Sequence, residues 1–377
     1  MGVTHHRVLS CSDFPPRPGS ERSPFHVESI VDASGVGGPG YTLVMSDRGP
    51  SNPREPSTSA SVAVWSGPHA SIYAEGTAAR LESSLVGTGS APTGQTTDSG
   101  SDGLATFDDL RTGPHACGAD AVLLADRTFD PTMNLQGAPR LCTLEPLVRP
   151  SPASEPVLLV GLLVRSPGYM AARQVLDDFG PISSMRVTSH CGPGQGSLYA
   201  RLFDAVSLVL TLLGAPDLID AMLVPPTPPA GSDAKLPPSE VPDVPVEGLA
   251  RLSGDLGVLV RCQPLGLATI SASDQASWER TATLLGPSGT LKIHETGISW
   301  TGTGGREIES WTREAPPFEL ACRQAAIEVD RWLAGNGPKV LEVDETLATA
   351  TCEATRLSCR TREPESTERV RDLLSRT

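Results

Sequence analysis

The stretch that decides the fold is Asp120-Ala-Val-Leu-Leu-Ala125, an uninterrupted apolar run of strand length. A strand that is apolar on both faces belongs in a parallel sheet that is covered on both sides. Similar short runs lie on either side of it, and helical segments separate some of them. We expect strands at residues 7–11, 27–32, 140–144 and 157–163, and helices at 70–85 and 107–110. The alternation predicts a doubly wound α/β domain.

The pattern changes after Pro167, where alternating strands and amphipathic helices follow one another. The clearest helix spans residues 197–214, with its apolar residues on one face and Gly214 as its C-cap. We expect further helices at 169–178, 318–334 and 341–358, and strands at 182–190, 248–252, 257–262, 266–272, 280–285, 290–294 and 297–301. This series predicts an α+β domain with a large, mostly antiparallel open sheet.

Two domains are expected, at residues 1–150 and 151–377, because the strand pattern changes near 149–156. Stretches rich in Gly, Pro and Ser at 46–60 and 87–101 read as loops. The stretch at 225–245 holds eight prolines, which predicts an extended insertion.

Composition narrows the range of functions. The 44 acidic and 30 basic residues give a net charge of -14, and no run of Lys or Arg occurs, so nucleic-acid binding is not expected. No apolar segment is long enough for a membrane span and no secretory signal is visible, so we expect a cytoplasmic protein. The eight scattered cysteines and seven histidines show no metal-ligand spacing, and we expect no metal.

The order of these segments resembles the glucose–fructose oxidoreductase and inositol dehydrogenase (Gfo/Idh/MocA) family. The resemblance is carried by Leu144-Glu-Pro-Leu147, where the family has Glu-Lys-Pro, by Gly196-Ser-Leu through Leu213-Gly214, and by Leu285-Gly-Pro-Ser-Gly-Thr-Leu291. It implies a Rossmann domain, followed by an α/β domain with a large open sheet. It also implies that a nicotinamide dinucleotide binds at a glycine-rich turn after the first strand.

The chain departs from that pattern at the cofactor site. After the run at 7–11 comes a turn with three prolines and no G-x-G-x-x-G, so few amides can reach a phosphate. Gly35-Val-Gly-Gly-Pro-Gly40 reads as a flexible turn. Asp32, at the end of the run at 27–32, stands where the family's ribose-binding acid would be, or caps a strand. The degenerate Rossmann-like domain is therefore expected to bind no cofactor.

The resemblance also implies catalytic positions, namely the Lys of Glu-Lys-Pro and an Asp and a His on the helix at 197–214. Glu145 stands at the Lys position and Asp204 at the His position, and they are the catalytic candidates by position alone. Repulsion by Glu145 would raise the pKa of Asp204, and no cation to balance the two is evident. Arg201 is expected to pair with Asp204 at i, i+3.

Two functions follow from this comparison. The first is an oxidoreductase-like protein that has lost hydride transfer and serves as a binding, regulatory or structural subunit, with a small polyhydroxylated ligand as one possibility. The alternative is an active NAD(P)-dependent dehydrogenase that acts on a sugar or polyol with relocated catalytic residues. A titration with NADH and NADPH separates the two.

The C-terminal sheet also predicts an assembly. We expect a homo-oligomer through the outer face of residues 248–301, unless the insertion at 225–245 covers that face. The apolar residues expected there are Val258, Val260, Leu267, Ile270, Leu291, Ile293 and Trp300.

Overall fold

The computed structural model describes residues 60–67, 69–90, 105–107, 112–125, 140–147, 157–226, 252–263, 266–335 and 344–375, all within the compact unit Ser59–Thr377. Several predicted features lie outside these residues: the strands at 7–11 and 27–32, Asp32, the turn at 35–40 and nearly all of the insertion at 225–245. No helix in the described ranges is long and apolar enough to cross a membrane.

Sheet A is made of six parallel strands, which lie in the order β3-β2-β1-β4-β5-β6. In chain order they are β1 (Ser61–Ser66), β2 (Ser84–Ser90), β3 (Ala105–Phe107), β4 (Ala121–Ala125), β5 (Arg140–Thr143) and β6 (Leu158–Leu159). This order is that of doubly wound dinucleotide-binding sheets. All of β4 is buried, as expected for a strand covered on both faces. The predicted Rossmann-like fold is confirmed.

Among the described residues, the first strand of sheet A is β1, which is followed directly by helix α1 (Ser71–Ala78). The predicted helix at 70–85 is too long, because its last residues pair in β2. The predicted loop at 87–101 also gives its first residues to β2, and Phe107, expected to begin a helix, ends β3. Pairing with a neighbouring strand here outweighs weak local signals. A short helix, α2 (Gly113–Ala116), precedes β4.

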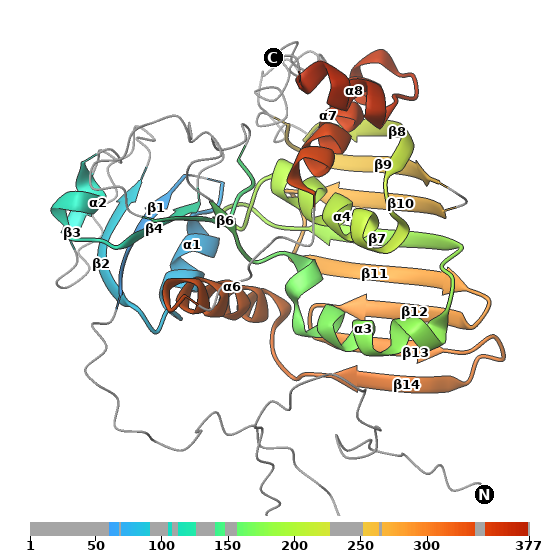
Figure 1. The fold of residues 1–377 in the computed structure, drawn as a ribbon, viewed down its shortest axis with the longest axis horizontal. Coiled ribbons are helices and arrows are strands. Elements are labelled where there is room, and N and C mark those ends of the chain that lie inside the picture. The colour runs from blue at the N-terminus through green and yellow to red at the C-terminus, as the bar shows by residue number, and fades with distance from the viewer. Residues whose placement is uncertain are drawn as a thin grey trace, which may run out of the picture. The chain divides into compact units, whose positions relative to one another are not determined.

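Sheet B has eight strands in the order β14-β13-β12-β11-β7-β10-β9-β8 (Figure 1). They are β7 (Ser184–His190), β8 (Pro216–Val224), β9 (Asp255–Cys262), β10 (Gly266–Ser273), β11 (Glu279–Gly286), β12 (Gly289–His294), β13 (Gly297–Thr301) and β14 (Glu307–Thr312). Within this sheet β7 and β10 pair parallel and the other neighbours pair antiparallel. The large, mostly antiparallel sheet is confirmed. The edge strands β8 and β14 were not predicted.

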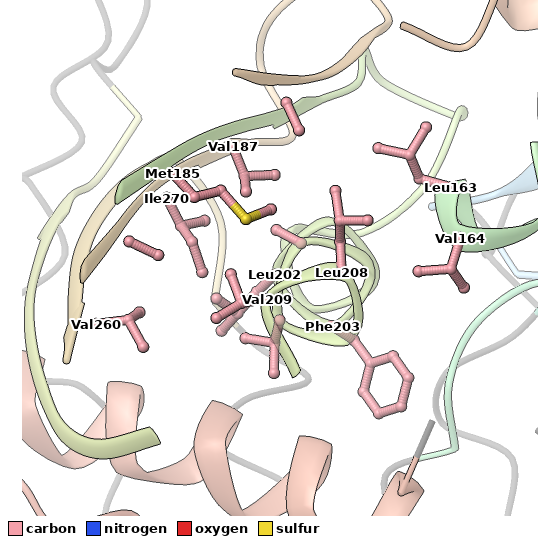
Figure 2. Packing of buried hydrophobic residues seen from close by; sticks show 14 of the residues in the cluster. Leu163, Val164, Met185, Val187, Leu202, Phe203, Leu208, Val209, Val260 and Ile270 are labelled. Carbon is pink, nitrogen blue, oxygen red and sulfur yellow. The ribbon is translucent and has the colours of Figure 1, made fainter. Parts of the chain in front are cut away.

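Helices cover one face of sheet B, as Figure 1 shows for α3, α4 and α7. The elements are the 3-10 helix η1 (Leu163–Arg165), α3 (Pro167–Phe179), α4 (Leu198–Leu213), α7 (Glu345–Thr361) and α8 (Thr367–Leu374). The predicted α4 is confirmed, with Ser197 as N-cap and Gly214 as C-cap. Figure 2 shows its apolar side chains beside Met185, Val187 and Ile270 of the sheet.

The prediction of an apolar patch on the outer face of sheet B is wrong for all but one of its residues. Val258, Val260, Ile270, Leu291, Ile293 and Trp300 are buried in the helix-covered core. Leu267 is the exception, with 42% of its surface exposed. The reason is the two-residue period of a strand: Leu267 and Ile270 are three residues apart and therefore point to opposite faces.

Sheet A also uses residues from beyond position 150. β6 pairs with β5, and helix α6 (Pro317–Leu333), which follows β14 in the chain, packs against α1 (Figure 1). Val329 of α6 shares a buried cluster with Val62 of β1. The division into residues 1–150 and 151–377 stays a prediction.

Candidate functional site

The chain turns after β1 at Trp65-Ser66-Gly67-Pro68-His69-Ala70. In a turn of the form G-x-G-x-x-G/A, Gly67 and Ala70 take the second and third positions, and Trp65 takes the first. The Gly67 N–H donates to the Ala125 carbonyl oxygen at 2.9 Å, which fixes the turn against the end of β4. Sequence reasoning missed this turn because it looked after residues 7–11. The apolar run just before Gly67 was the available signal.

The N-terminus of α1 is occupied by the chain itself. The N–H groups of Ile72 and Tyr73 both donate to the Gly194 carbonyl oxygen, at 2.8 and 3.2 Å. The Gly196 N–H in turn donates to the His69 carbonyl oxygen at 2.8 Å. In a dinucleotide-binding domain, amides at this position point at the pyrophosphate. Here the loop between β7 and α4 takes their place, so these residues do not fit a bound dinucleotide.

The acid that would hold a ribose is also missing from the observed second strand. Such an acid lies about 20 residues after the glycine turn, near the end of the second strand. β2 reads Ser84-Leu-Val-Gly-Thr-Gly-Ser90 and contains no acidic residue. Within the described part of the chain, β2 is the second strand of sheet A. Asp32, to which the sequence analysis assigned this role, lies outside the described residues and stays a prediction.

Glu145 follows β5 and is buried, with 1% of its surface exposed. The Ser197 N–H donates to Glu145 Oε1 at 2.9 Å, and the Ser197 hydroxyl donates to Oε2. A carboxylate is stabilised here by the positive end of the α4 dipole. The candidate at the family's Lys position thus anchors the start of α4 to sheet A.

Asp204, in the second turn of α4, is held by two partners. Its Oδ1 accepts from the Leu163 N–H at 2.7 Å, and its Oδ2 lies 3.3 Å from Arg280 Nη1. The predicted pair with Arg201 is therefore wrong, and the cation that the sequence did not reveal is Arg280. The sequence suggested Arg201 because it lies one helical turn before Asp204. In the structure, β11 instead places Arg280 beside that carboxylate. Glu145 and Asp204 have separate sets of partners.

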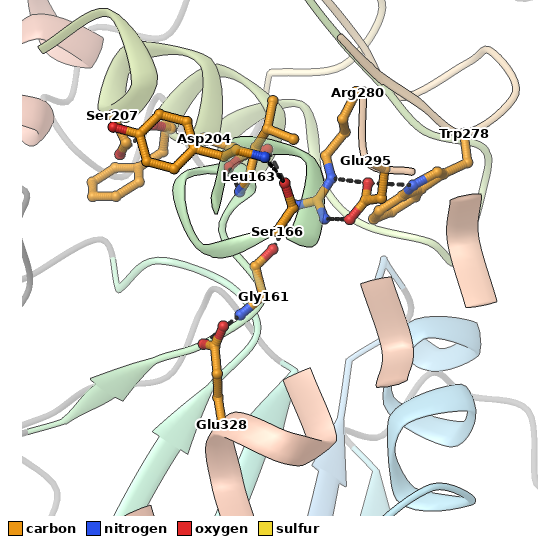
Figure 3. A network of polar contacts seen from close by, with 11 residues as sticks. Gly161, Leu163, Ser166, Asp204, Ser207, Trp278, Arg280, Glu295 and Glu328 are labelled. Atoms are coloured by element: carbon orange, nitrogen blue, oxygen red, sulfur yellow. Dashed lines mark hydrogen bonds and ion pairs between the residues drawn. The ribbon is translucent and has the colours of Figure 1, made fainter. Parts of the chain in front are cut away.

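Arg280 is the centre of a buried polar network (Figure 3). Its Nε donates to Glu295 Oε2 at 2.7 Å, its Nη2 pairs with Glu295 Oε1, and its Nη1 donates to the Gly161 carbonyl oxygen. Burial acts to lower the Arg280 pKa, but the charges of Glu295 and Asp204 outweigh it and raise the pKa. The guanidinium therefore stays charged.

A second buried arginine, Arg201, lies on the same cluster with 3% of its surface exposed. Its guanidinium carbon lies 4.6 Å from the centroid of the Trp278 ring. Its Nε and Nη1 have no hydrogen-bond partner. Sequence reasoning treated this residue as a helix-surface partner for Asp204. The apolar face of α4 gave no sign that Arg201 would be buried.

Tyr73 of α1 meets the same indole ring from the other sheet. Its ring centroid lies 5.4 Å from that of Trp278 in an edge-on contact, and its hydroxyl has no hydrogen-bond partner. Burial raises the pKa of Tyr73, so the phenol keeps its proton. Sequence reasoning missed both Tyr73 and Trp278, because neither belongs to a motif. Together with Arg201 they form what we call the Trp278 cluster.

The remaining polar groups near α4 serve the fold. The Ser207 hydroxyl, also on α4, donates to the Phe203 carbonyl oxygen at 2.7 Å. Burial raises the pKa of Cys191 to about 12, so this thiol is not a reactive thiolate at neutral pH. Among the described residues, no three His, Cys, Asp or Glu side chains are grouped to hold a metal ion.

No protein-family model matches the chain, and no curated protein does either. Solved structures do. A levoglucosan dehydrogenase in complex with NADH and L-sorbose matches with a TM-score of 0.57 and 12% identity, over 82% of this chain and 98% of that one. The scyllo-inositol dehydrogenase from Lactobacillus casei with bound NAD(H) and scyllo-inositol gives 0.56 and 13%, over 82% and 100%.

The myo-inositol 2-dehydrogenase from Lactobacillus plantarum gives a TM-score of 0.56 and 13% identity, over 81% of this chain and 99% of that one. The chain thus has the fold of inositol dehydrogenases and related oxidoreductases, as the sequence resemblance implied. At this level of identity the similarity defines the fold, and the function has to be argued from the site.

Proposed function

We propose that this chain is an oxidoreductase-like protein that has lost hydride-transfer chemistry and serves as a binding, regulatory or structural subunit. The observation that carries the proposal is the closed N-terminus of α1. Ile72 and Tyr73 donate their N–H groups to Gly194, where a cofactor pyrophosphate would need them. Trp65 at the first glycine position and the absence of an acid in β2 support the same conclusion.

The catalytic candidates support the proposal as well. A base for hydride chemistry must reach a substrate hydroxyl, as a side chain within hydrogen-bond distance of the proton that it removes. Glu145 and Asp204 both accept hydrogen bonds from neighbouring backbone N–H groups instead. Two structural neighbours are described with L-sorbose and with scyllo-inositol, which makes a small polyhydroxylated molecule the ligand class we propose.

The test is a fluorescence titration of the full chain with NADH and NADPH, checked by thermal shift. We expect no saturable binding below millimolar concentration. The informative variant is Ser71→Asp, because an acid in the first turn suits a helix but repels a phosphate. Saturable micromolar binding that Ser71→Asp abolishes would overturn the proposal and favour an active NAD(P)-dependent dehydrogenase.

We also propose a homo-oligomer in the cytoplasm that assembles through the uncovered face of sheet B. Leu267 and Leu285 both lie opposite Ser184, on either side of β7, and are 42% and 45% exposed. Light scattering is expected to give more than the monomer mass of 39.5 kDa, and Leu267→Asp should lower it. Leu373→Asp, at an exposed position on α8, is the control. A monomer at micromolar concentration would contradict this assembly.

A further inference from the structure

The Trp278 cluster contains a buried cation whose nitrogens are not satisfied. Only 3% of the Arg201 surface is exposed, and its guanidinium lies over the Trp278 ring. Its Nε and Nη1 nevertheless have no hydrogen-bond acceptor. A buried charged group without hydrogen bonds is costly, and folded proteins rarely leave one unpaired. The other residues of the cluster are apolar or already have partners. The fold itself therefore does not require an arginine at position 201.

The nearby carboxylates already have partners. Glu295 and Asp204 pair with Arg280, and Glu328 pairs with Arg165 at 2.8 Å. Glu145 also lies close by: Glu145 Oε1 and Arg201 Nε are both 3.5 Å from the point that a Gly196 Cβ would occupy. Glu145 accepts from Ser197, and Arg201 Nε and Nη1 have no hydrogen-bond partner.

A second unsatisfied donor lies against the same ring. The Tyr73 hydroxyl is buried and has no partner, and Tyr73 contacts the edge of the indole whose face carries Arg201. One donor comes from sheet A through α1, and the other comes from α4 on sheet B. Nε and Nη1 lie on different edges of a guanidinium, since the shared edge is that of Nε and Nη2, as Arg280 shows with Glu295. Each therefore offers a single N–H to an anionic oxygen, and the phenol O–H adds a neutral donor.

We propose that Arg201 and Tyr73 bind the carboxylate of a small acidic ligand between the two sheets, and that this ligand is a polyhydroxylated acid such as a sugar acid. The inference deepens the binding role proposed above and rests on it. Arg201 supplies the charge and single N–H donors, whereas Tyr73 supplies a neutral donor. The carboxylate follows from the donors, since five N–H groups on a guanidinium include no acceptor. The hydroxylated chain is the ligand class proposed above.

The experiment compares two probes that differ only at one carbon. D-gluconate and D-glucitol share a hydroxylated six-carbon chain, but only gluconate carries a carboxylate. In calorimetric titration of the full chain at low salt, gluconate should bind at least about tenfold more tightly than glucitol. Arg201→Gln should remove that preference. The control is Arg186→Gln, which removes the same charge from an exposed position on β7 of the same sheet.

Tyr73→Phe keeps the test decisive if Arg201→Gln fails to fold. It deletes only an unsatisfied hydroxyl, so the variant should fold and yet bind gluconate several-fold more weakly. Arg201→Lys should also weaken binding, because it keeps the charge but loses the guanidinium N–H donors at Nε and Nη1. The proposal is wrong if neither probe binds, if both bind equally, or if Arg186→Gln weakens gluconate as much as Arg201→Gln. NADH binding tests the lost cofactor site separately, so the two proposals can fail independently.

Discussion

Two buried arginines lie against the Trp278 ring and differ in their hydrogen bonding. Arg280 and Arg201 place their guanidinium carbons 5.0 and 4.6 Å from the Trp278 centroid. Arg280 bonds to Glu295, Asp204 and the Gly161 carbonyl oxygen, whereas Arg201 has two nitrogens without any acceptor. Equal burial with unequal hydrogen bonding separates a structural residue from a candidate binding residue.

The Arg280 network joins the two sheets. Gly161 lies between β6 of sheet A and η1, and its N–H donates to Glu328 of α6 at 3.1 Å while its carbonyl accepts from Arg280 of β11. Asp204 adds α4 to the same network. The network therefore ties sheet A, α6, α4 and β11 together at one buried point.

The largest effect should come from removing the satisfied arginine. Arg280→Met leaves Asp204 and Glu295 buried without a cation, and we expect a loss of about 3–5 kcal/mol in the free energy of unfolding. Urea denaturation followed by circular dichroism measures it. Arg186→Met, at an exposed position, should change the same quantity by less than about 0.5 kcal/mol. A loss below about 1 kcal/mol for Arg280→Met would mean that the network does not hold the sheets.

The next effect should come from the backbone at the joint. Gly161 has a φ of 77°, in the left-handed region, and an added Cβ would collide with the Tyr73 hydroxyl. Gly161→Ala should therefore destabilise the protein by about 2–3 kcal/mol, from strain and from overlap together. Adding Tyr73→Phe removes the atom in the way and should recover part of the loss. If the double variant is no more stable than Gly161→Ala, the collision contributes nothing.

The unsatisfied arginine should matter much less to stability. Arg201→Met replaces a buried cation that lacks acceptors by an apolar side chain, so the free energy of unfolding should stay within about 1 kcal/mol or rise. The measurement is again urea denaturation, without added ligand. A loss as large as that of Arg280→Met would show that Arg201 has a structural partner and would end the contrast between the two arginines.

The fold could be predicted from the sequence because its signals are local. The class of sheet A was indicated by the apolar run at Ala121–Ala125. The class of the second domain was indicated by the amphipathic face and the caps of α4. Register could not be read in the same way: Leu267 and Ile270 are equally apolar, and only the pairing of β10 decides which of them faces the helices.

The site could be predicted far less well. Asp204 and Glu145 were found by position, but their partners Arg280 and Ser197 come from segments 76 and 52 residues away. Arg201 was paired with Asp204 because a helix spacing is visible in a sequence and a contact from β11 is not. The turn after β1 was missed because the sequence analysis looked for a glycine turn only after the apolar run at 7–11.

The smallest expected effect concerns pH and comes from His294, which precedes Glu295 of the network. Burial, and then the charge of Lys292, hold the His294 pKa below its ordinary value of 6.5. Below pH 6.5 the unfolded chain therefore takes up a proton that the folded protein declines, so stability should fall as the pH drops towards the folded pKa. We expect a small loss in the free energy of unfolding, measured by urea denaturation between pH 7 and 5. His294→Gln should flatten this dependence, whereas His190→Gln, on β7 of the same sheet, should leave it in place. An unchanged slope in His294→Gln would assign the pH dependence to other groups.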